Sequence, residues 1–347
     1  MNIKSKIITC IRKHRLKKWT LKHGMEFHLH SSKISKLKQI KLNRSGFNEI
    51  QNYIFNLNNA KDKKKQYLSQ FDRWQMRNIN GAYKIILDDK RLFEIYFAKH
   101  VKIPQILFYI MDSKIYDSDF LLSDNEQVIK TLKKCKLFFR TNEAGGGTGA
   151  HLFELKDNQI IMDSNIVVSS TVFNTLKNGN LSMYLDQLDY SKKIYSYSTN
   201  TIRIITINDG GNYKIVACAH RFGTSESKFV DNASSGGIFC SINTNTGIMG
   251  KAYSEYHDCC YLKHPDTLEQ IEGVAIPFWQ QCKEKIINLH KKAPYFKLVA
   301  WDVVLQQDGQ IAVIEGNASS DITLIQTEKG LKNEELGLFL KKNGCLF

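Results

Sequence analysis

The sequence of 347 residues contains no uninterrupted apolar run of the roughly 18 residues that a membrane-spanning helix needs. It has no apolar secretory core near its start, so we predict no signal peptide. It also has no CxxC pair among its eight cysteines, which predicts reduced thiols in a cytoplasmic protein. Internal repeats and low-complexity linkers are absent as well. The length therefore predicts a globular chain of two domains or lobes with a sizeable core.

Two short clusters lack the residues that would complete a known motif. His257, Cys259, Cys260 and His264 match no common spacing of zinc ligands, so we predict no zinc site there. Residues 145–147 are three consecutive glycines, which could turn several backbone N–H groups towards an anion. No Lys-Ser or Lys-Thr follows them, and the predicted strands on both sides exclude a dinucleotide fingerprint. This glycine loop is therefore either an anion-binding loop or the tip of a flexible hairpin.

Basic charge is concentrated at the N-terminus. Residues 1–50 hold 13 Lys and Arg and two acids, so +11 of the net charge of +15 lies there. The first 24 residues place isoleucines at helical spacing among lysines and arginines, which predicts a basic amphipathic helix. Such a helix could lie on an anionic membrane surface, or it could be an ordinary helix with a solvated basic face. We expect no nucleic-acid partner, because no nucleic-acid-binding motif accompanies the charge.

The rest of the chain alternates strand and helix signals. Residues 33–80 are polar and mostly helical in pattern, and Gly81 marks a break. Hydrophobic periodicity and turn residues predict the remaining elements. Helices are expected at 89–100 and 278–292, and strands at 105–110, 137–139, 151–155, 201–207, 213–220, 298–305 and 311–314. The tail 331–347 is expected to form a last short helix and a loose end.

The last two strands organise the site that we predict. Asp308-Gly309 between alternating hydrophobic residues is a strong hairpin signal. With these two residues as the loop, Asp302 lies directly opposite Glu315, and Asn317 shares their face. Two opposed carboxylates repel each other, so the arrangement favours a cation between them. A hard divalent ion such as Mg²⁺, which prefers oxygen ligands, fits this set.

A second hairpin carries two arginines. Arg203 lies in the strand before the turn at 209–212, and Arg221 lies at the end of the strand after it. A loop of two or of three residues changes whether Arg221 shares the face of Arg203, and the sequence does not decide between them.

The motifs of the C-terminal half, taken in order, resemble the sugar-transfer-associated branch of the ATP-grasp superfamily. The resemblance covers about residues 85–328. The motifs are Asn200-Thr201-Ile202-Arg203, Gly236-Gly237-Ile238, His264-Pro265-Asp266-Thr267, Ile276-Pro277-x-Trp279, and Trp301-Asp302 with Glu315-Gly316-Asn317.

The resemblance implies an α+β ATP-grasp fold, in which two α+β lobes hold ATP and two Mg²⁺ ions between them. We expect a basic, mostly helical region at 1–80, a first lobe with the glycine loop at 81–180, a second lobe with the metal site at 181–330, and a tail at 331–347. No Rossmann-like domain is evident before the first lobe.

The resemblance also assigns metal and nucleotide contacts. Asp302, Glu315 and Asn317 match the residues that hold the metals in the family. Lys90 looks like the family's first phosphate-contacting lysine, and Arg140 stands where a second lysine is common. Arg140 keeps the charge but not the geometry of a lysine. The remaining nucleotide contacts are expected from Gly145, Gly146 and Gly147 over the phosphates, and from Met183 and Tyr184 in a segment, 182–187, that resembles the adenine-binding hinge.

Substrate contacts follow from the same resemblance. Arg203 and Arg221 are the catalytic candidates for binding the acyl phosphate and the acceptor carboxylate, with an ion pair as the alternative role of each. Asn232, Gly236 and Gly237 would donate neutral hydrogen bonds beside them. His264 either touches the sugar or amine acceptor or is a loop residue satisfied by the backbone.

The activity that the resemblance implies is ATP-dependent joining of a carboxylate to an amine through an acyl phosphate. The expected substrate is a saccharide or its lipid-linked precursor in cell-surface polysaccharide biosynthesis. A phosphotransferase that acts on a hydroxyl group and a catalytically weak nucleotide-binding module remain as alternatives. A cytoplasmic location is expected, with the N-terminal segment at the inner membrane face as an option.

Overall fold

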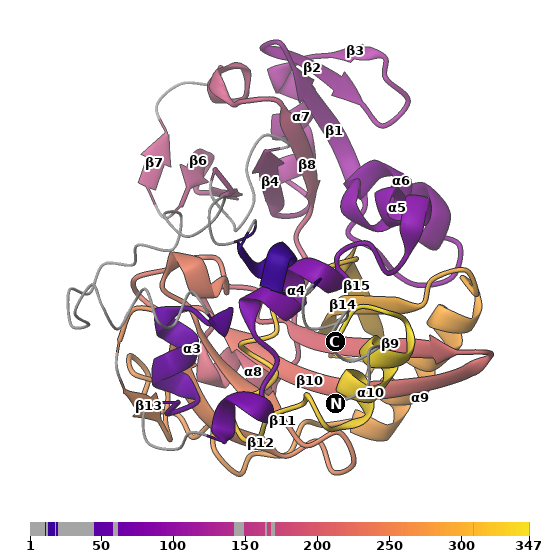
Figure 1. Ribbon diagram of the computed structural model, residues 1–347. Helices are drawn as coiled ribbons and strands as arrows, with labels where there is room; N and C mark the ends of the chain where they lie inside the picture. Colours follow the sequence, from indigo (N-terminus) through magenta and orange to yellow (C-terminus); the bar gives the residue numbers. More distant parts are fainter. Residues whose placement is uncertain are drawn as a thin grey trace.

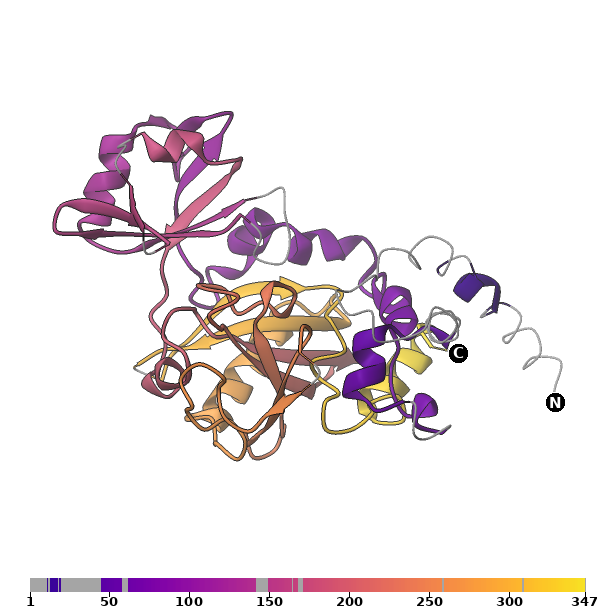
Figure 2. The same cartoon turned by 90° about the vertical axis from the view of Figure 1, so that its left-hand side faces the viewer.

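The computed structural model describes residues 11, 13–17, 19, 45–57, 62–141, 149–163, 165–167, 171–257, 259–307 and 309–346. This part of the chain forms two antiparallel sheets, each with its own helices, which stand one above the other (Figure 1). Viewed from the side, the smaller lobe projects away from the larger one (Figure 2). The predicted α+β class with two lobes is confirmed.

The smaller lobe contains an eight-stranded sheet with the order β3-β2-β1-β8-β4-β5-β6-β7. Its elements are β1 (Ile106–Met111), β2 (Lys114–Asp117), β3 (Leu122–Ser123), α7 (Asn125–Leu132), β4 (Leu137–Thr141), β5 (His151–Lys156), β6 (Gln159–Met162), β7 (Asn165–Val167), η3 (Val172–Thr175) and β8 (Gly179–Met183). Val128 and Leu132 of α7 pack into the core of this sheet with Phe139 and Phe153. The hairpin predicted around the glycine loop is confirmed as β4–β5, but Gly145, Gly146 and Gly147 lie outside the described residues.

The larger lobe contains a seven-stranded sheet with the order β13-β12-β11-β10-β9-β14-β15. Its elements are α8 (Asp189–Ile194), β9 (Ile202–Asp209), β10 (Asn212–Phe222), η4 (Ala233–Ser235), β11 (Ile238–Ile242), β12 (Met249–Ser254), β13 (Cys260–Tyr261), α9 (Trp279–Lys291), β14 (Leu298–Leu305), β15 (Ile311–Asn317) and α10 (Glu335–Lys342). The predicted helix at 278–292 and the two predicted hairpins are confirmed as α9, β9–β10 and β14–β15.

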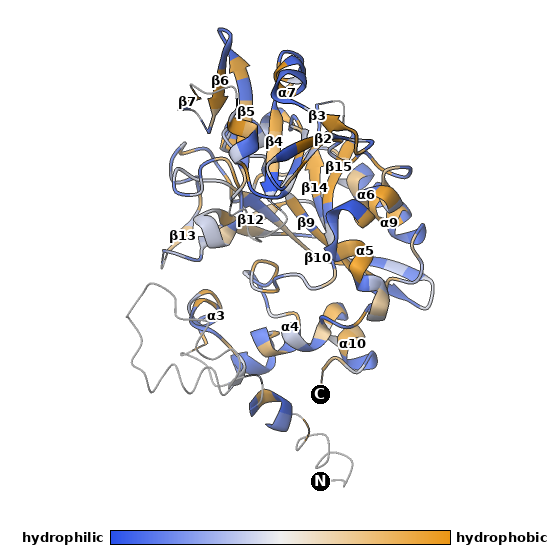
Figure 3. Ribbon diagram, turned by 90° about the horizontal axis from the view of Figure 1, so that it is seen from above, coloured by the Kyte–Doolittle hydropathy of each residue, from blue (hydrophilic) through white to orange (hydrophobic). Residues whose placement is uncertain are grey.

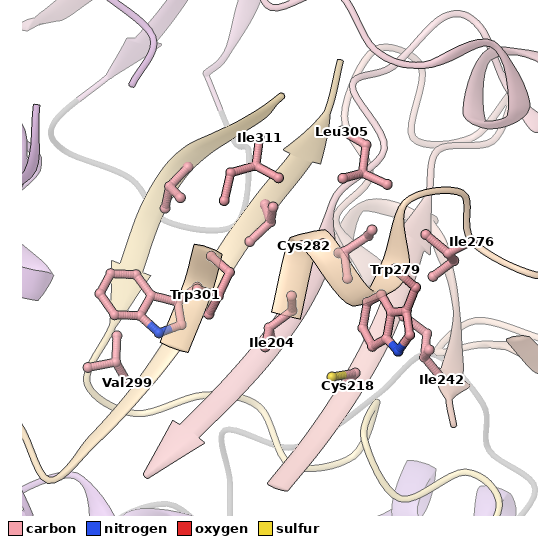
Figure 4. Packing of buried hydrophobic residues seen from close by; sticks show 14 of the residues in the cluster. Ile204, Cys218, Ile242, Ile276, Trp279, Cys282, Val299, Trp301, Leu305 and Ile311 are labelled. Atoms are coloured by element: carbon pink, nitrogen blue, oxygen red, sulfur yellow. The ribbon is translucent and has the colours of Figure 1, made fainter. Parts of the chain in front are cut away.

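Both faces of the larger sheet are buried, because the strand period of two sends alternate residues of β14 to opposite cores. Val299 and Trp301 pack in one core with Ile204 and with Trp279 of α9 (Figure 4). Val303 belongs to the same core. Leu298 and Ala300 pack on the other face against a second core. Colouring by hydropathy shows hydrophobic stretches concentrated in the strands and in the short helices beside them (Figure 3).

The N-terminal helices and the tail belong structurally to the larger lobe. The helices are α3 (Glu49–Ile54), η1 (Lys63–Lys65), α4 (Gln70–Met76), η2 (Gly81–Tyr83), α5 (Lys84–Asp88) and α6 (Lys90–Phe97). Ile54 and Met76 share a core with Leu336, Phe339 and Leu346 of the tail, so the expected loose end is wrong. Leu87, Phe93 and Phe97 pack under the larger sheet, although the predicted boundaries placed α5 and α6 in the smaller lobe. Most of the predicted basic helix at 1–24 lies outside the described residues.

The β14–β15 hairpin has the predicted pair and a different turn. Asp302 lies opposite Glu315, as expected. Nearer the turn, however, Val303 pairs with Val313, and the Gln306 N–H donates to the Gln310 carbonyl at 2.9 Å. The predicted two-residue loop is therefore wrong, since three residues, 307–309, separate this last backbone pair. A bulge at residue 314 restores the register that places Glu315 opposite Asp302.

The β9–β10 hairpin resolves the open question about Arg221. Gly210 and Gly211 form a two-residue loop with φ values of 64° and 94°, which favour glycine. The register then shifts between Ile215 and Ala217, so that Ala219 lies opposite Arg203. Because side chains alternate along a strand, Arg221 projects from the same face as Ala219 and Arg203.

Two expectations from composition can be compared with the described residues. In that part of the chain, no helix is both long and apolar enough to cross a bilayer. The seven cysteines found there form no disulfide, as predicted.

Candidate functional site

A cleft of about 980 Å³ lies between the two sheets. Strands β1, β4 and β8 line it from the smaller lobe, and β9, β10, β14 and β15 line it from the larger lobe. Nine of the residues that the sequence singled out line this one cleft: Lys90, Arg140, Tyr184, Arg203, Arg221, Asn232, Asp302, Glu315 and Asn317.

Asp302 is the charged centre of the cleft. It is 1% exposed and lies directly opposite Arg203 on the neighbouring strand. The Arg203 Nε donates to Asp302 Oδ1, and Arg203 Nη2 donates to Oδ2 at 2.9 Å. Arg221 Nη2 also donates to Oδ2 at 2.9 Å. Burial disfavours the carboxylate, yet Arg203 and Arg221 together outweigh it and lower the pKa of Asp302 below its ordinary value.

The two arginines differ in how many of their guanidinium N–H donors remain unused within the described chain. Arg203 also donates from Nη1 to Ser320 Oγ at 2.9 Å, so every nitrogen of its guanidinium is engaged. Arg221 donates from Nε and Nη2 to Thr201 Oγ1, at 2.9 and 2.6 Å. No residue of the described chain accepts a hydrogen bond from Arg221 Nη1. Burial opposes its charge, but the carboxylates of Asp231 and Asp302 raise the pKa of Arg221 overall. Arg203 is thus held on Asp302 by its hydrogen bonds, whereas the Nη1 group of Arg221 remains available to bind a ligand.

The predicted metal ligands provide hard oxygen donors on two adjacent strands. Glu315 is opposite Asp302, and Asn317 Nδ2 donates to Glu315 Oε1 at 3.3 Å, which leaves the amide oxygen of Asn317 for another partner. Asp302 has little capacity left, because its oxygens already accept three hydrogen bonds from arginine. A divalent ion fits this donor set, with Glu315 and Asn317 as the more available ligands. Among the described residues, no group of three His, Cys, Asp or Glu gathers as a metal site.

Lys90 and Arg140 face Glu315 as cations with no ion-pair partner within the described chain. Lys90 is the first residue of α6, and Arg140 is near the end of β4. The loss of hydration on burial is the largest effect and lowers the pKa of both groups. The negative charge of Glu315 raises the pKa of both, but by less. The Nε of Arg140 is buried and has no hydrogen-bond partner in the part of the chain that the structure describes. Such a desolvated pair of cations is costly unless an anion joins it.

Asn180 is a polar residue of the cleft that the sequence did not reveal. It lies in β8 directly opposite Arg140 and is 2% exposed. Its Oδ1 is buried with no hydrogen-bond partner. No sequence motif marked it, because only the sheet register places it beside Arg140.

Only one of the two residues expected to contact adenine lines the cleft. Tyr184 lines the cleft, whereas Met183 does not. The Met183 N–H donates to the Gln105 carbonyl at 2.9 Å, and the Tyr184 N–H donates to the Lys136 carbonyl at 3.0 Å. These two backbone donors are therefore already used within the smaller lobe.

Three expected substrate contacts lie outside the cleft lining. His264 is fully buried, its Nε2 bonds to the Gly223 carbonyl at 2.7 Å, and its Nδ1 accepts from the Asp266 N–H at 3.2 Å. This arrangement favours the alternative that His264 is a loop residue satisfied by the backbone. The N–H groups of Gly236 and Gly237 donate to carbonyls of their own turn, which corrects their expected role as donors to substrate.

The sequence also missed three charged residues at one end of the cleft. Arg73 of α4, Glu255 after β12 and Asp321 after β15 all line it. No motif marks them, since they come from three separate segments. Arg73 belongs to the N-terminal region that the resemblance left without a role.

Comparisons with known proteins agree with the resemblance. A family model described as "Sugar-transfer associated ATP-grasp" matches residues 70–337. No curated protein matches the chain. Among solved structures, the chain is similar to D-alanyl-alanine synthetase A from Vibrio cholerae, with TM-score 0.42, 11% identity, and coverage of 74% of this chain and 64% of that chain.

Two further structures are similar at the same level. For the VanG D-Ala:D-Ser ligase from Enterococcus faecalis, the TM-score is 0.42 at 10% identity, covering 74% of this chain and 61% of that chain. For the ADP complex of N5-carboxyaminoimidazole ribonucleotide synthetase, the TM-score is 0.39 at 10% identity, covering 68% and 46%. The chain spans less than two thirds of the length of each of these three proteins.

Proposed function

The chain belongs to the sugar-transfer-associated ATP-grasp family, and on this basis we propose that it is an ADP-forming ligase. It would use ATP and Mg²⁺ to activate a carboxylate as an acyl phosphate and join it to an amine. The substrate would be a saccharide or its lipid-linked precursor in cell-surface polysaccharide biosynthesis.

The observation that carries the proposal is a pair of cations, Lys90 and Arg140, with no ion-pair partner among the described residues. Both face a cleft that is large enough for a nucleotide, and no described residue accepts a hydrogen bond from the Nε of Arg140. A triphosphate supplies several strong acceptors and the negative charge that these groups lack. The remainder of the nucleotide would lie towards Tyr184 and Leu185, which line the same cleft near the hinge.

The opposite wall of the cleft would provide the metal ligands. Glu315 and Asn317, with Asp302 behind them, would hold one or two Mg²⁺ ions against the phosphates. When bound, Mg²⁺ would supply charge stabilisation for the transferring phosphoryl group. Glu315 thus serves both as a metal ligand and as the counter-charge to Lys90 and Arg140.

The reaction needs a carboxylate oxygen to attack the γ-phosphorus, while the bond to the β-phosphate oxygen breaks and ADP leaves. The neutral amine nitrogen then attacks the acyl carbon, the C–N bond forms, inorganic phosphate leaves and the nitrogen releases a proton. Arg221 is placed to bind the acyl phosphate through its remaining donors. Arg203 acts as a positioning residue, because its donors hold Asp302 and Ser320. Asn232, which also lines the cleft, would contact the same group.

Nucleotide binding tests the first half of this proposal. We expect full-length protein to bind ATP in calorimetry with Mg²⁺, and Lys90→Met and Arg140→Met each to weaken binding about ten- to hundredfold. Lys156→Met, which removes an exposed lysine at the end of β5, is the matched control and should bind normally. Equal affinity in all four proteins would contradict the phosphate site.

Hydroxylamine trapping tests the chemistry. With ATP, Mg²⁺ and a panel of carboxylated sugars and amino acids, an activated carboxylate gives a hydroxamate. ADP release with a phosphorylated hydroxyl product and no hydroxamate would establish the phosphotransferase alternative. ATP binding without turnover of any tested substrate would favour the nucleotide-binding module.

A further inference from the structure

One end of the cleft carries charges of both signs. Arg73 Nη1 donates to Asp321 Oδ2 at 3.0 Å, and both residues line the cleft. Glu255 also lines the cleft, and the charges of Asp321 and Arg73 both act on its carboxylate. This group of three residues is the mixed-charge end of the cleft.

Arg73 lies in helix α4, which several contacts hold in place. Ser69 and Asp72 form a reciprocal capping box at its start. Lys332 donates to Asp72 at 3.2 Å, and Gln70 Nε2 donates to Thr323 Oγ1 at 3.2 Å. These contacts fix α4 to the C-terminal segment that follows β15, so the N-terminal region provides a wall of the cleft.

Glu255 is a carboxylate with no ion-pair or hydrogen-bond partner among the described residues. Its side chain is half-buried. Burial, followed by repulsion from Asp321, raises the pKa of Glu255 to about 7, although Arg73 opposes the change. A ligand that brings a positive charge to this carboxylate would therefore be favoured.

Arg73 offers the complementary charge. Asp321 engages only one of its terminal nitrogens, and the other donors of the planar guanidinium have no partner in the described chain. A planar guanidinium suits a carboxylate, which can accept two of its N–H groups. An anion-binding group and a cation-binding group thus lie side by side.

We infer that this end of the cleft binds a free amino acid as a zwitterion, with its ammonium group against Glu255 and its carboxylate against Arg73. The inference rests on the proposed function, because it identifies this amino acid as the amine that receives the acyl group. The ammonium group first passes one proton to the Glu255 carboxylate, and the neutral amine then attacks the acyl carbon. Its place follows from the chain: Asp321 adjoins Ser320, and Ser320 Oγ accepts from Arg203, which holds Asp302. These contacts link this end of the cleft to Asp302.

Ligand-observed NMR on the full-length protein tests the inference directly. The probes are the twenty protein amino acids and D-alanine, screened with the non-hydrolysable ATP analogue AMPPNP and Mg²⁺. Each amino acid that binds is then compared with its methyl ester and with the amine that lacks the carboxylate. We expect the intact amino acid to bind and both derivatives to bind at least tenfold more weakly.

Variants locate the binding. Arg73→Met and Glu255→Gln should each weaken amino-acid binding about ten- to hundredfold and leave AMPPNP binding unchanged. Arg77→Met, one turn along from Arg73 and stacked over the Trp74 ring, is the matched control and should bind normally. Thermal melting and AMPPNP binding identify any variant that fails to fold.

The outcomes separate the inference from the proposed function. If AMPPNP binds but no amino acid does, or if the derivatives bind as well as the amino acid, the zwitterion site is refuted while the ligase proposal stands. If AMPPNP itself does not bind, the proposed function fails. Binding that is unchanged in both Arg73→Met and Glu255→Gln also refutes the site.

Discussion

Replacing Glu255 with glutamine should stabilise the folded protein, and the gain should depend on pH. The carboxylate has a folded pKa of about 7, against 4.5 for an unperturbed glutamate. The folded state therefore holds a proton that the unfolded state releases between these two values, so stability falls as pH rises from about 4.5 to about 7. At about 1.4 kcal/mol per pH unit, the wild-type charge costs about 3 kcal/mol at pH 8. At pH 5 it costs only about 1 kcal/mol.

Urea unfolding followed by tryptophan fluorescence measures this difference. Glu255→Gln should exceed the wild type by about 2–3 kcal/mol at pH 8 and by about 1 kcal/mol or less at pH 5, because the neutral amide resembles the protonated acid. Glu284→Gln on the exposed side of α9 should change stability by less than about 0.5 kcal/mol at either pH. A gain that is equal at both pH values, or a loss at pH 8, would refute the reasoning.

Three further outcomes are expected. Glu315→Gln should abolish Mg²⁺-dependent ATP turnover while the protein stays folded, and full turnover would remove the metal site from the proposal. Asp302→Asn should cost about 3–5 kcal/mol in urea unfolding, because it leaves two buried guanidinium groups against a neutral amide. Since the folded pKa of Asp302 is lowered, the wild-type stabilisation is complete above pH 3.8 and is lost as pH falls through the folded pKa, so the difference should shrink in acid. Deleting residues 1–24 should remove salt-sensitive binding to anionic vesicles in co-sedimentation; equal pelleting of both proteins would rule out the membrane role.

The outcome for Asp302→Asn reverses what the sequence suggests. Two opposed carboxylates predict that removing one relieves repulsion and stabilises the protein without metal. The structure shows Asp302 saturated by Arg203 and Arg221. A cross-strand arginine cannot be inferred from the spacing within one hairpin, because β9 precedes β14 by about a hundred residues.

Local signals determined the elements well. Alternation and turn residues predicted both hairpins of the larger lobe, and the periodicity at 278–292 predicted α9. The motifs around Asp302 and Glu315 were enough to indicate the family, which the match over residues 70–337 confirms. These features are encoded within short stretches, so the sequence alone reveals them.

Tertiary structure alone decided which side chains share the cleft. If the pairing next to the turn continued along β9–β10, Arg221 and Arg203 would project from different faces of the sheet. If the pairing next to the turn continued along β14–β15, Glu315 and Asp302 would also project from different faces. One bulge in each hairpin moves the later residue onto the site face. A bulge is set by packing on both sides of the sheet and leaves no fixed sequence mark. The same holds for Arg73 and Glu255, which line one cleft only because α4 docks against the larger lobe.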